Sequence, residues 1–324
     1  MAETDSIAGS AEPRTIGKAP VQSPSAASGP AGPLDDKLDL DPPLEIPEPL
    51  EVEPPTAEAP APAPQAPVPP PAGGTAGGGP AKAESSFARR GQSQRIVHFD
   101  TQESRASCRD ILESDLYDWP VGIKPPTLLW DVGAYVGAAS LAFARQFPAA
   151  AIHAFEPCAA ARGLLQENLG GLPKATVHET AVWYQDGKRT LYAGKGDPLT
   201  ASLVRSPLTE TQGEEVSARH ADALLDALGL SRVDGLKIAT GGCEVAILEA
   251  LIRHLEAIPV VFIDYRSETD RRRIDLILCA THMLLKGRIY GPQHGHLCYG
   301  LRRVLSKEGS GEDMAVRLHR RPDN

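Results

Sequence analysis

In the central part of the chain, short apolar runs alternate with segments whose apolar residues recur at helical spacing. Residues 127–130, 151–155 and 259–264 are runs of strand length, and the third stays apolar until its terminal acid. Strands buried on both faces of a parallel sheet have this composition. Residues 138–147, between the first two runs, have the spacing of a helix. This alternation predicts an α/β fold built on a parallel sheet.

The same patterns predict the other elements of a domain that spans residues 127–305. Further helices are expected at 158–168, 222–228, 242–255 and 269–285. Further strands are expected at 176–182, 188–193, 202–204, 215–218 and 234–238, with an antiparallel pair at 288–290 and 297–302. Residues 96–119 have an apolar face at helical spacing over their second half, so residues 96–126 are predicted to form an N-terminal helical adornment. Residues 306–324 are polar, which predicts a loose tail.

Composition separates residues 1–95 from the rest of the chain. They contain 19 of the 30 prolines and a single aromatic residue, Phe87. Such a segment buries too little apolar surface to offset its ordering entropy, so we expect it to be disordered. Residues 35–58 are acidic with spaced leucine and isoleucine residues. They fit either a linear motif for a protein partner or a solubilising spacer.

The charge and the cysteine content of the chain indicate which classes of partner and which cellular compartment to expect. Residues 1–95 carry 7 basic and 13 acidic side chains, so the total of −9 leaves about −3 for residues 96–324. This balance gives no support to a nucleic-acid partner. The five cysteines include no C-x-x-C pair, which is typical of a reducing compartment. Because we find no signal-peptide pattern and no apolar run near the roughly 20 residues of a membrane span, we expect a cytoplasmic protein.

The turn after residues 127–130 carries the candidate chemistry. Asp131 ends the first strand, Gly133 and Gly137 lie in the turn, and Glu156 follows the second strand. This is the order of a βαβ nucleotide-binding unit. Gly133 has no Cβ to keep backbone N–H groups away from a ligand, and a carboxylate at position 156 could accept both hydroxyl hydrogens of a ribose. The alternative is a buried βαβ unit whose glycines only turn the chain.

The glycine spacing narrows the class of ligand. Gly133-x3-Gly137 is not the G-x-G-x-x-G fingerprint of dinucleotide enzymes. A nicotinamide oxidoreductase is therefore disfavoured, and a ligand without a pyrophosphate is favoured. S-adenosylmethionine is the commonest ligand of that kind.

From about residue 127 to residue 304, the chain resembles the FkbM family of S-adenosylmethionine-dependent methyltransferases. The motifs that carry the resemblance are, in order, DVGAYVG (131–137), FEP (155–157), ETAV (179–182), ASLV (201–204), VSARHADALL (216–225) and LKIATGGCEVAILEAL (236–251). Many methyltransferases share the first motif, whereas the complete series is far more specific.

The resemblance implies a Rossmann-like methyltransferase fold, with a seven-stranded, mostly parallel sheet and helices on both faces. It also implies S-adenosylmethionine as the cofactor and a hydroxyl of a sugar or natural-product-like small molecule or glycan as the acceptor. Glu156 would take the ribose hydroxyls of the cofactor, with Thr180 and Ala181 beside the adenine. The amino-acid end would lie against the turn residues Asp131, Gly133, Ala134, Tyr135 and Gly137.

One departure from the family leaves two functions open. After its fourth strand the family typically has K-I-D-V-E-G, and this chain has K-I-A-T-G-G at residues 237–242. Ala239 and Gly241 therefore replace two carboxylates at a strand end that faces the reaction centre in this architecture. The chain is either an active methyltransferase or a catalytically degenerate, methyltransferase-like binding module whose acidic tail reaches a partner.

Two remaining acids are candidates for the base that deprotonates an acceptor hydroxyl. Asp264, at the end of the fifth strand, comes first because the family usually has an acid there, and Glu244, near a helix start, comes second. The alternative for Asp264 is a capping or loop carboxylate. His294 and His296 could form a metal pair, but no third ligand follows at a suitable spacing, so no metal site is predicted.

Overall fold

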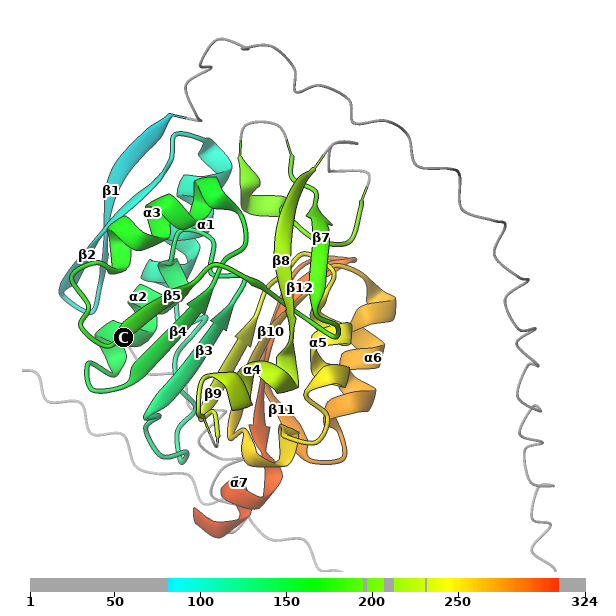
Figure 1. Cartoon of the computed structure of the whole chain (residues 1–324). Coiled ribbons are helices and arrows are strands. Elements are labelled where there is room, and N and C mark those ends of the chain that lie inside the picture. Colours follow the sequence, from blue (N-terminus) through cyan, green and yellow to red (C-terminus); the bar gives the residue numbers. More distant parts are fainter. Residues whose placement is uncertain (1–80, 195–196, 207–212, 231, 309–324) are drawn as a thin grey trace, which may run out of the picture. The chain divides into compact units, whose positions relative to one another are not determined.

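A computed structural model describes residues 81–308 except 195–196, 207–212 and 231 (Figure 1). At its centre lies a seven-stranded sheet in the order β11-β12-β10-β9-β3-β4-β5. Neighbours from β5 to β10 pair in parallel, and β12 pairs antiparallel with both β10 and β11. This confirms the predicted Rossmann-like methyltransferase fold. The strands are β3 (Leu128–Val132), β4 (Ala151–Phe155), β5 (Ala175–His178), β9 (Gly235–Ile238), β10 (Val260–Tyr265), β11 (His282–Gly291) and β12 (His294–Leu301).

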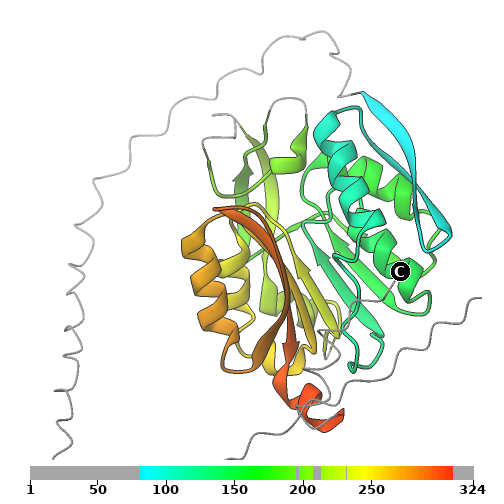
Figure 2. The same ribbon diagram turned by 180° about the vertical axis from the view of Figure 1, so that it is seen from behind.

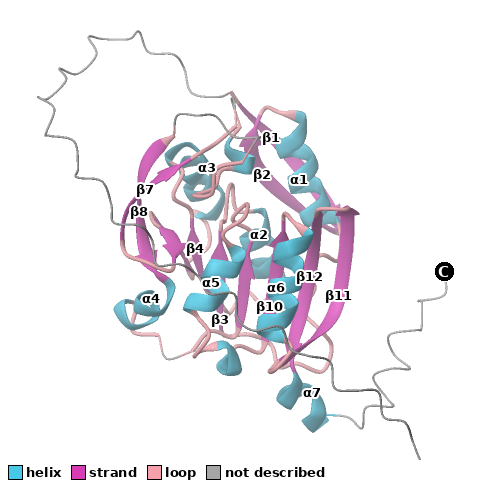
Figure 3. Ribbon diagram, turned by 90° about the vertical axis from the view of Figure 1, so that its right-hand side faces the viewer, coloured by secondary structure: helices cyan, strands magenta, loops and turns pink. Residues whose placement is uncertain are grey.

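Helices cover both faces of this sheet. One face packs against α1 (Gln102–Glu113), α2 (Ala138–Gln146) and α3 (Ala159–Leu169). The other packs against α4 (Ala221–Ala227), α5 (Glu244–Ala250) and α6 (Glu268–Leu278), and Figure 3 shows α5 and α6 lying over it. The alternation of strand side chains produces these layers. Trp130 and Val132 join the core beneath α4 to α6, whereas Leu129 packs with Phe143 of α2 on the opposite face.

A smaller sheet stands beside the main one. It has the order β6-β8-β7, formed by β6 (Ala181–Trp183), β7 (Gly187–Leu191) and β8 (Glu214–His220). The prediction of one strand over residues 176–182 was therefore wrong, since that segment divides between β5 of the main sheet and β6 of the small one. Thr180 lies at the division, and its hydroxyl donates to the carbonyl oxygen of Ser217 at 3.1 Å. Residues 202–204 contribute only a bridge from Ser202 to Tyr192.

The N-terminal part of the described chain corrects two predictions. An antiparallel hairpin of β1 (Lys82–Arg89) and β2 (Gln92–Phe99) replaces the predicted disorder up to residue 95, and helix begins only at Gln102 rather than at 96. The cyan hairpin lies beside α1 in Figures 1 and 2. Phe87 is buried, and Asn168 of α3 accepts the N–H of Val97 at 2.8 Å and donates to its carbonyl at 2.7 Å. Contacts with residues distant in sequence thus order this segment.

Several other boundaries also differ from those predicted. The helix expected to run to residue 285 ends at Leu278, because the chain reverses there and enters β11 at His282. The helix α7 (Arg302–Glu308) includes the first residues of the predicted loose tail, and two 3₁₀ turns are η1 (Pro198–Thr200) and η2 (Leu255–Ala257). Residues 1–80 and 309–324 lie outside the described residues, so predictions for them stay predictions. No helix in the described ranges is long and apolar enough to cross a membrane.

Candidate active site

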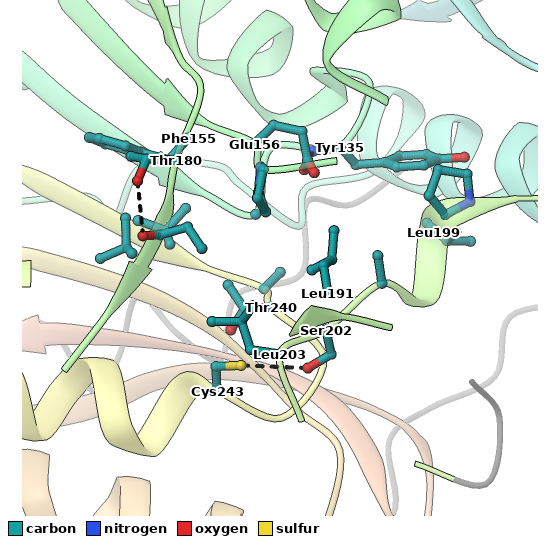
Figure 4. A pocket seen from close by; sticks show the side chains of 18 residues that line it. Tyr135, Phe155, Glu156, Thr180, Leu191, Leu199, Ser202, Leu203, Thr240 and Cys243 are labelled. Carbon is teal, nitrogen blue, oxygen red and sulfur yellow. Dashed lines mark hydrogen bonds between the residues drawn. The ribbon is translucent and has the colours of Figure 1, made fainter. Parts of the chain in front are cut away.

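A cavity opens where β3, β4 and β9 end (Figure 4). Open α/β sheets bind ligands at this edge. Five of the residues predicted to contact a cofactor line the cavity: Gly133, Tyr135, Glu156, Thr180 and Ala181. Three others lie outside its lining: Asp131, Ala134 and Gly137.

The turn after β3 requires glycine at two positions. Gly133 has φ +73°, and a Cβ there would lie only 2.1 Å from the carbonyl oxygen of Ala239. Gly137 has φ +93°, and its Cβ would lie 2.8 Å from Cδ1 of Leu165. Gly133 therefore lets the turn touch the loop after β9, and Gly137 lets α2 begin against α3.

Tyr135 joins this turn to the residue before η1 and to α1. Its hydroxyl donates to Oδ1 of Asp197 at 2.6 Å and accepts from the Ser104 hydroxyl at 2.7 Å. Asp197 also accepts the Thr101 hydroxyl at 2.5 Å and the N–H of Leu199 at 2.9 Å. One carboxylate thus ties the turn, the start of α1 and η1 together at the cavity wall. No motif in the sequence indicated Asp197, because its partners come from distant segments.

Glu156 is a buried carboxylate in the cavity wall, with 6% of its surface exposed. Its Oε2 accepts the N–H of Tyr135 at 2.7 Å, and its Oε1 accepts the N–H of Cys158 at 2.9 Å. Burial raises the pKa of this carboxyl to about 7, although the two N–H groups and the charge of Lys237 act to lower it. Each oxygen keeps the capacity to accept a further hydrogen bond, and a contact with ribose hydroxyls stays a prediction.

Asp131 is fully buried below the glycine turn. Its Oδ1 lies 2.8 Å from Nζ of Lys237, and its Oδ2 accepts the Ser140 hydroxyl at 2.6 Å. Lys237 also donates to the carbonyl oxygen of Gly133 at 2.6 Å. Buried ion pairs need such additional hydrogen bonds to offset the loss of hydration. The Asp131–Lys237 pair therefore braces the turn from beneath, and a direct contact of Asp131 with a cofactor stays a prediction.

The loop after β9 presents no carboxylate to the cavity. Ala239 and Thr240 line it, while Gly241 has φ +71° and a Cβ there would lie 3.2 Å from Cβ of Ser202. An L side chain is strained in this backbone conformation. The family's glutamate at position 241 would therefore be strained in the loop as this chain folds it.

Glu244, the second candidate base, holds that loop in place. It is fully buried, and burial raises its pKa. Its Oε1 accepts the N–H of Thr240 at 2.7 Å and the Thr240 hydroxyl at 3.1 Å, and its Oε2 accepts the N–H of Gly242 at 2.8 Å. Glu244 does not line the cavity. Its geometry is that of a loop brace.

Asp264, the first candidate base, lies at the end of β10 and outside the cavity lining. It faces His296 directly in the β10–β12 register and accepts the N–H of His296 Nδ1 at 2.7 Å. Burial opposes ionisation of this carboxyl, but the hydrogen bond and charge of His296, with the charges of Lys237 and Arg266, outweigh it and lower the pKa. Asp264 is therefore ionised at neutral pH, and its role as a base stays a prediction.

The sequence had indicated His296 only as half of a metal pair. Its pairing with Asp264 depends on the register between β10 and β12, which no local pattern shows. In the described part of the chain, no group of three or more histidine, cysteine, aspartate or glutamate side chains is placed to hold a metal ion.

Comparison with protein families identifies a family for this chain. The model described as the methyltransferase FkbM domain matches residues 131–298, just over half of the chain. The AMB antimetabolite synthetase AmbE of Pseudomonas aeruginosa is 27% identical over 194 residues, which cover 48% of this chain and 9% of that protein. The chain thus spans less than a tenth of the length of this relative.

Solved structures show weaker likenesses. The precorrin-6y C5,15-methyltransferase of Geobacter metallireducens is 15% identical with a TM-score of 0.36, and the match covers 63% of this chain and 90% of that one. The fibrillarin of Aeropyrum pernix, solved with natively bound S-adenosyl-L-methionine, is 10% identical with a TM-score of 0.37. That match covers 64% of this chain and 90% of that one.

Proposed function

The chain belongs to the FkbM methyltransferase family, and we propose that it moves a methyl group from S-adenosylmethionine to a hydroxyl oxygen of a sugar or natural-product-like acceptor, either a small molecule or a glycan. Family membership makes it an S-adenosylmethionine-dependent methyltransferase. The observation that carries the assignment of the cofactor site is the carboxylate of Glu156. It is buried in the cavity wall and keeps acceptor capacity on both oxygens.

The residues of the cavity fit this cofactor. Glu156 offers two acceptors for a ribose diol, and Gly133 lines the cavity within the turn. Thr180 and Ala181 would lie beside the adenine. We propose that the remaining predicted cofactor residues shape and support the turn that holds the amino-acid end: Asp131, Ala134, Tyr135 and Gly137. When bound, the cofactor supplies a methyl group already activated on a sulfonium.

The chain itself then has two tasks, which are to align the acceptor oxygen and to take its proton. We assign the second task to Asp264. Extending the β9–β10 register by one residue places Asp264 beside Ala239, where the family's carboxylate is missing. Its lowered pKa keeps it ionised at neutral pH. We therefore propose that Asp264 takes the hydroxyl proton from the side of the cavity where β9 and β10 end, which is the side that lacks the family's acids.

A calorimetric titration with S-adenosylmethionine tests the cofactor assignment. Glu156→Gln removes one acceptor oxygen at constant size, so affinity should weaken by about 1.5–3 kcal/mol, the range for a hydrogen bond to a charged group. Glu215→Gln, an exposed glutamate on β8, is the matched control and should bind as the wild type does. Equal binding by Glu156→Gln and the control would remove Glu156 from the site. A wild type that does not bind the cofactor would overturn the proposal.

A second candidate function is a binding module that no longer transfers methyl groups. The loss of carboxylates at Ala239 and Gly241 favours it. Methyl release measured with a panel of sugar and polyketide hydroxyls separates the two functions, since a module shows no turnover with any acceptor. The acidic residues 35–58 would then reach a protein partner. For either function we propose the cytoplasm as the compartment, which the five free cysteines support.

A further inference from the structure

The two oxygens of Asp264 have different surroundings. Oδ1 accepts the N–H of His296 Nδ1 at 2.7 Å, and within the described residues no hydrogen bond uses Oδ2. The Asp264 side chain keeps 20% of its surface exposed, whereas that of His296 keeps 1%. One oxygen is therefore held from inside the protein, and the other is left for a ligand.

The ring of His296 is packed between two aromatic side chains, and its hydrogen-bond partner is Asp264. Its ring stacks on Phe262 with centroids 6.1 Å apart at 24°, and Tyr117 meets it edge-on at 4.9 Å. Its other nitrogen, Nε2, is buried and has no hydrogen-bond partner among the described residues. Buried polar atoms are usually paired, so an unpaired one calls for an explanation. Nδ1 is therefore the nitrogen through which the His296 ring is hydrogen-bonded, and its partner is the carboxylate of Asp264.

Other charged and titratable groups surround Asp264 without bonding to it. Lys237 and Arg266 lower its pKa by charge alone, and His296 is the sole group in the described residues that hydrogen-bonds the side chain. The groups on which Asp264 itself acts electrostatically are Glu244 of α5, Tyr117 before β3, Tyr290 of β11 and His294 of β12. A change at His296 is therefore the most direct way to alter the carboxylate.

We propose that His296 is a positioning residue for methyl transfer, which fixes Oδ1 of Asp264 so that Oδ2 is presented to the acceptor hydroxyl. This inference rests on the proposed function. As a lone pair of the acceptor oxygen forms the new bond to the methyl carbon, the electrons of the broken carbon–sulfur bond go to sulfur. The hydroxyl proton passes to Oδ2 and later to solvent. His296 touches neither acceptor nor cofactor and acts through Asp264.

Three variants test this role. His296→Phe removes the donor but keeps a ring between Phe262 and Tyr117. His296→Asn returns an N–H donor near the position of Nδ1. His294→Phe makes the same exchange two residues away on β12 and is the matched control. Each protein is measured by ¹³C NMR titration of the Asp264 carboxyl, by calorimetry with S-adenosylmethionine, and by kcat and KM over a range of pH.

In His296→Phe, the titration of Asp264 should move to higher pH, because the lost donor had favoured the ionised carboxylate. The acid limb of the kcat profile should move in the same direction, and kcat should fall roughly 10- to 100-fold, less than the 10²–10⁴-fold yield of the base itself, because Asp264 is still present. Cofactor affinity should stay within about twofold, as expected for a residue that does not touch the cofactor. His296→Asn should recover part of both losses. His294→Phe should change both quantities far less than His296→Phe does, because His294 does not hydrogen-bond Asp264.

Two results would overturn the inference. One is an Asp264 titration that does not move in His296→Phe. The other is an equal fall of kcat in the Phe and Asn variants with no movement of the acid limb, which would show that His296 only packs. A wild type that binds no cofactor would instead overturn the proposed function, and the carboxyl titration would still decide whether His296 holds Asp264.

Discussion

Glu156 and Glu244 are both buried glutamates whose carboxylates accept two backbone N–H groups, and burial raises the pKa of both. The two glutamates differ in whether the carboxylate lies in the wall of the cavity, where it can accept hydrogen bonds from a ligand. Glu244 bonds only within its own loop, to Thr240 and Gly242, and does not line the cavity. Glu156 lines the cavity and keeps acceptor capacity facing it. Burial and a raised pKa therefore do not by themselves identify a ligand-binding carboxylate.

The same contrast extends to the two sides of the strand-end edge. On the β3–β4 side, the glycine turn and Glu156 have the arrangement expected for a cofactor site. On the β9 side, Ala239 and Gly241 have replaced carboxylates, and Glu244 serves to hold the loop. Asp264 is the acid that we assign to chemistry on that side. The following predictions test whether cofactor binding depends on the β3–β4 side and methyl transfer on the β9–β10 side.

The largest effect is expected from Asp264→Asn. Loss of a positioned base should slow methyl transfer by roughly 10²–10⁴-fold and leave cofactor affinity unchanged. Single-turnover rates with an accepted hydroxyl substrate measure the first quantity, and calorimetry measures the second. Undiminished turnover would show that the β9–β10 side contributes no base. Asp275→Asn on the outer helix α6 serves as the control.

Removal of the loop brace should affect folding rather than binding. Glu244→Ala leaves the partly buried N–H groups of Thr240 and Gly242 without acceptors, and an unsatisfied group of this kind costs about 1–3 kcal/mol. The free energy of unfolding in urea should therefore fall by about 4 kcal/mol. The affinity of the folded variant for the cofactor should stay within about threefold of the wild-type value, which is a change in binding free energy of less than about 1.4 kcal/mol. A stable variant with lost cofactor affinity would reverse the roles assigned to the two glutamates.

Glu156 should make stability decrease as pH rises. Its pKa of about 7 in the folded chain exceeds the ordinary 4.5, so the folded state binds this proton more tightly than the unfolded state does. The resulting stabilisation is complete below about pH 4.5 and is lost as pH rises through 7, a change of about 3 kcal/mol. The unfolding free energy of the wild type relative to Glu156→Gln should fall by that amount. A difference that stays flat with pH would contradict the raised pKa.

The smallest effect concerns the family's missing glutamate. Gly241→Glu should lower the free energy of unfolding by about 1–2 kcal/mol, because φ is +71° at this position. Gly171→Glu is the control, since its backbone φ is not in the left-handed region and no atom lies within 4 Å of its Cβ position. A gain in cofactor affinity without loss of stability would show that the loop adapts to the family's residue.

The sequence alone determined the features that depend on neighbouring residues. Runs of buried apolar residues predicted the central strands, the glycine pattern predicted the turn after β3, and Glu156 was predicted at a strand end where it lines a cavity. A strand buried on both faces needs apolar residues along its length, and a turn with φ above zero favours glycine. Both requirements can therefore be recognised in the residues that form the element. The Rossmann-like fold followed from the same local signals and from the resemblance to a family.

Only the tertiary structure decided which distant residues meet. Residues 82–95 read as part of a polar tail, yet they form β1 and the start of β2, with Phe87 buried and β2 tied to Asn168 of α3. Asp197 reaches Tyr135, and His296 reaches Asp264, across 62 and 32 positions of sequence. Such contacts depend on strand register and on how the layers pack. A hydrogen bond between residues far apart in the chain leaves no periodic trace in either segment, so the sequence pattern could not show it.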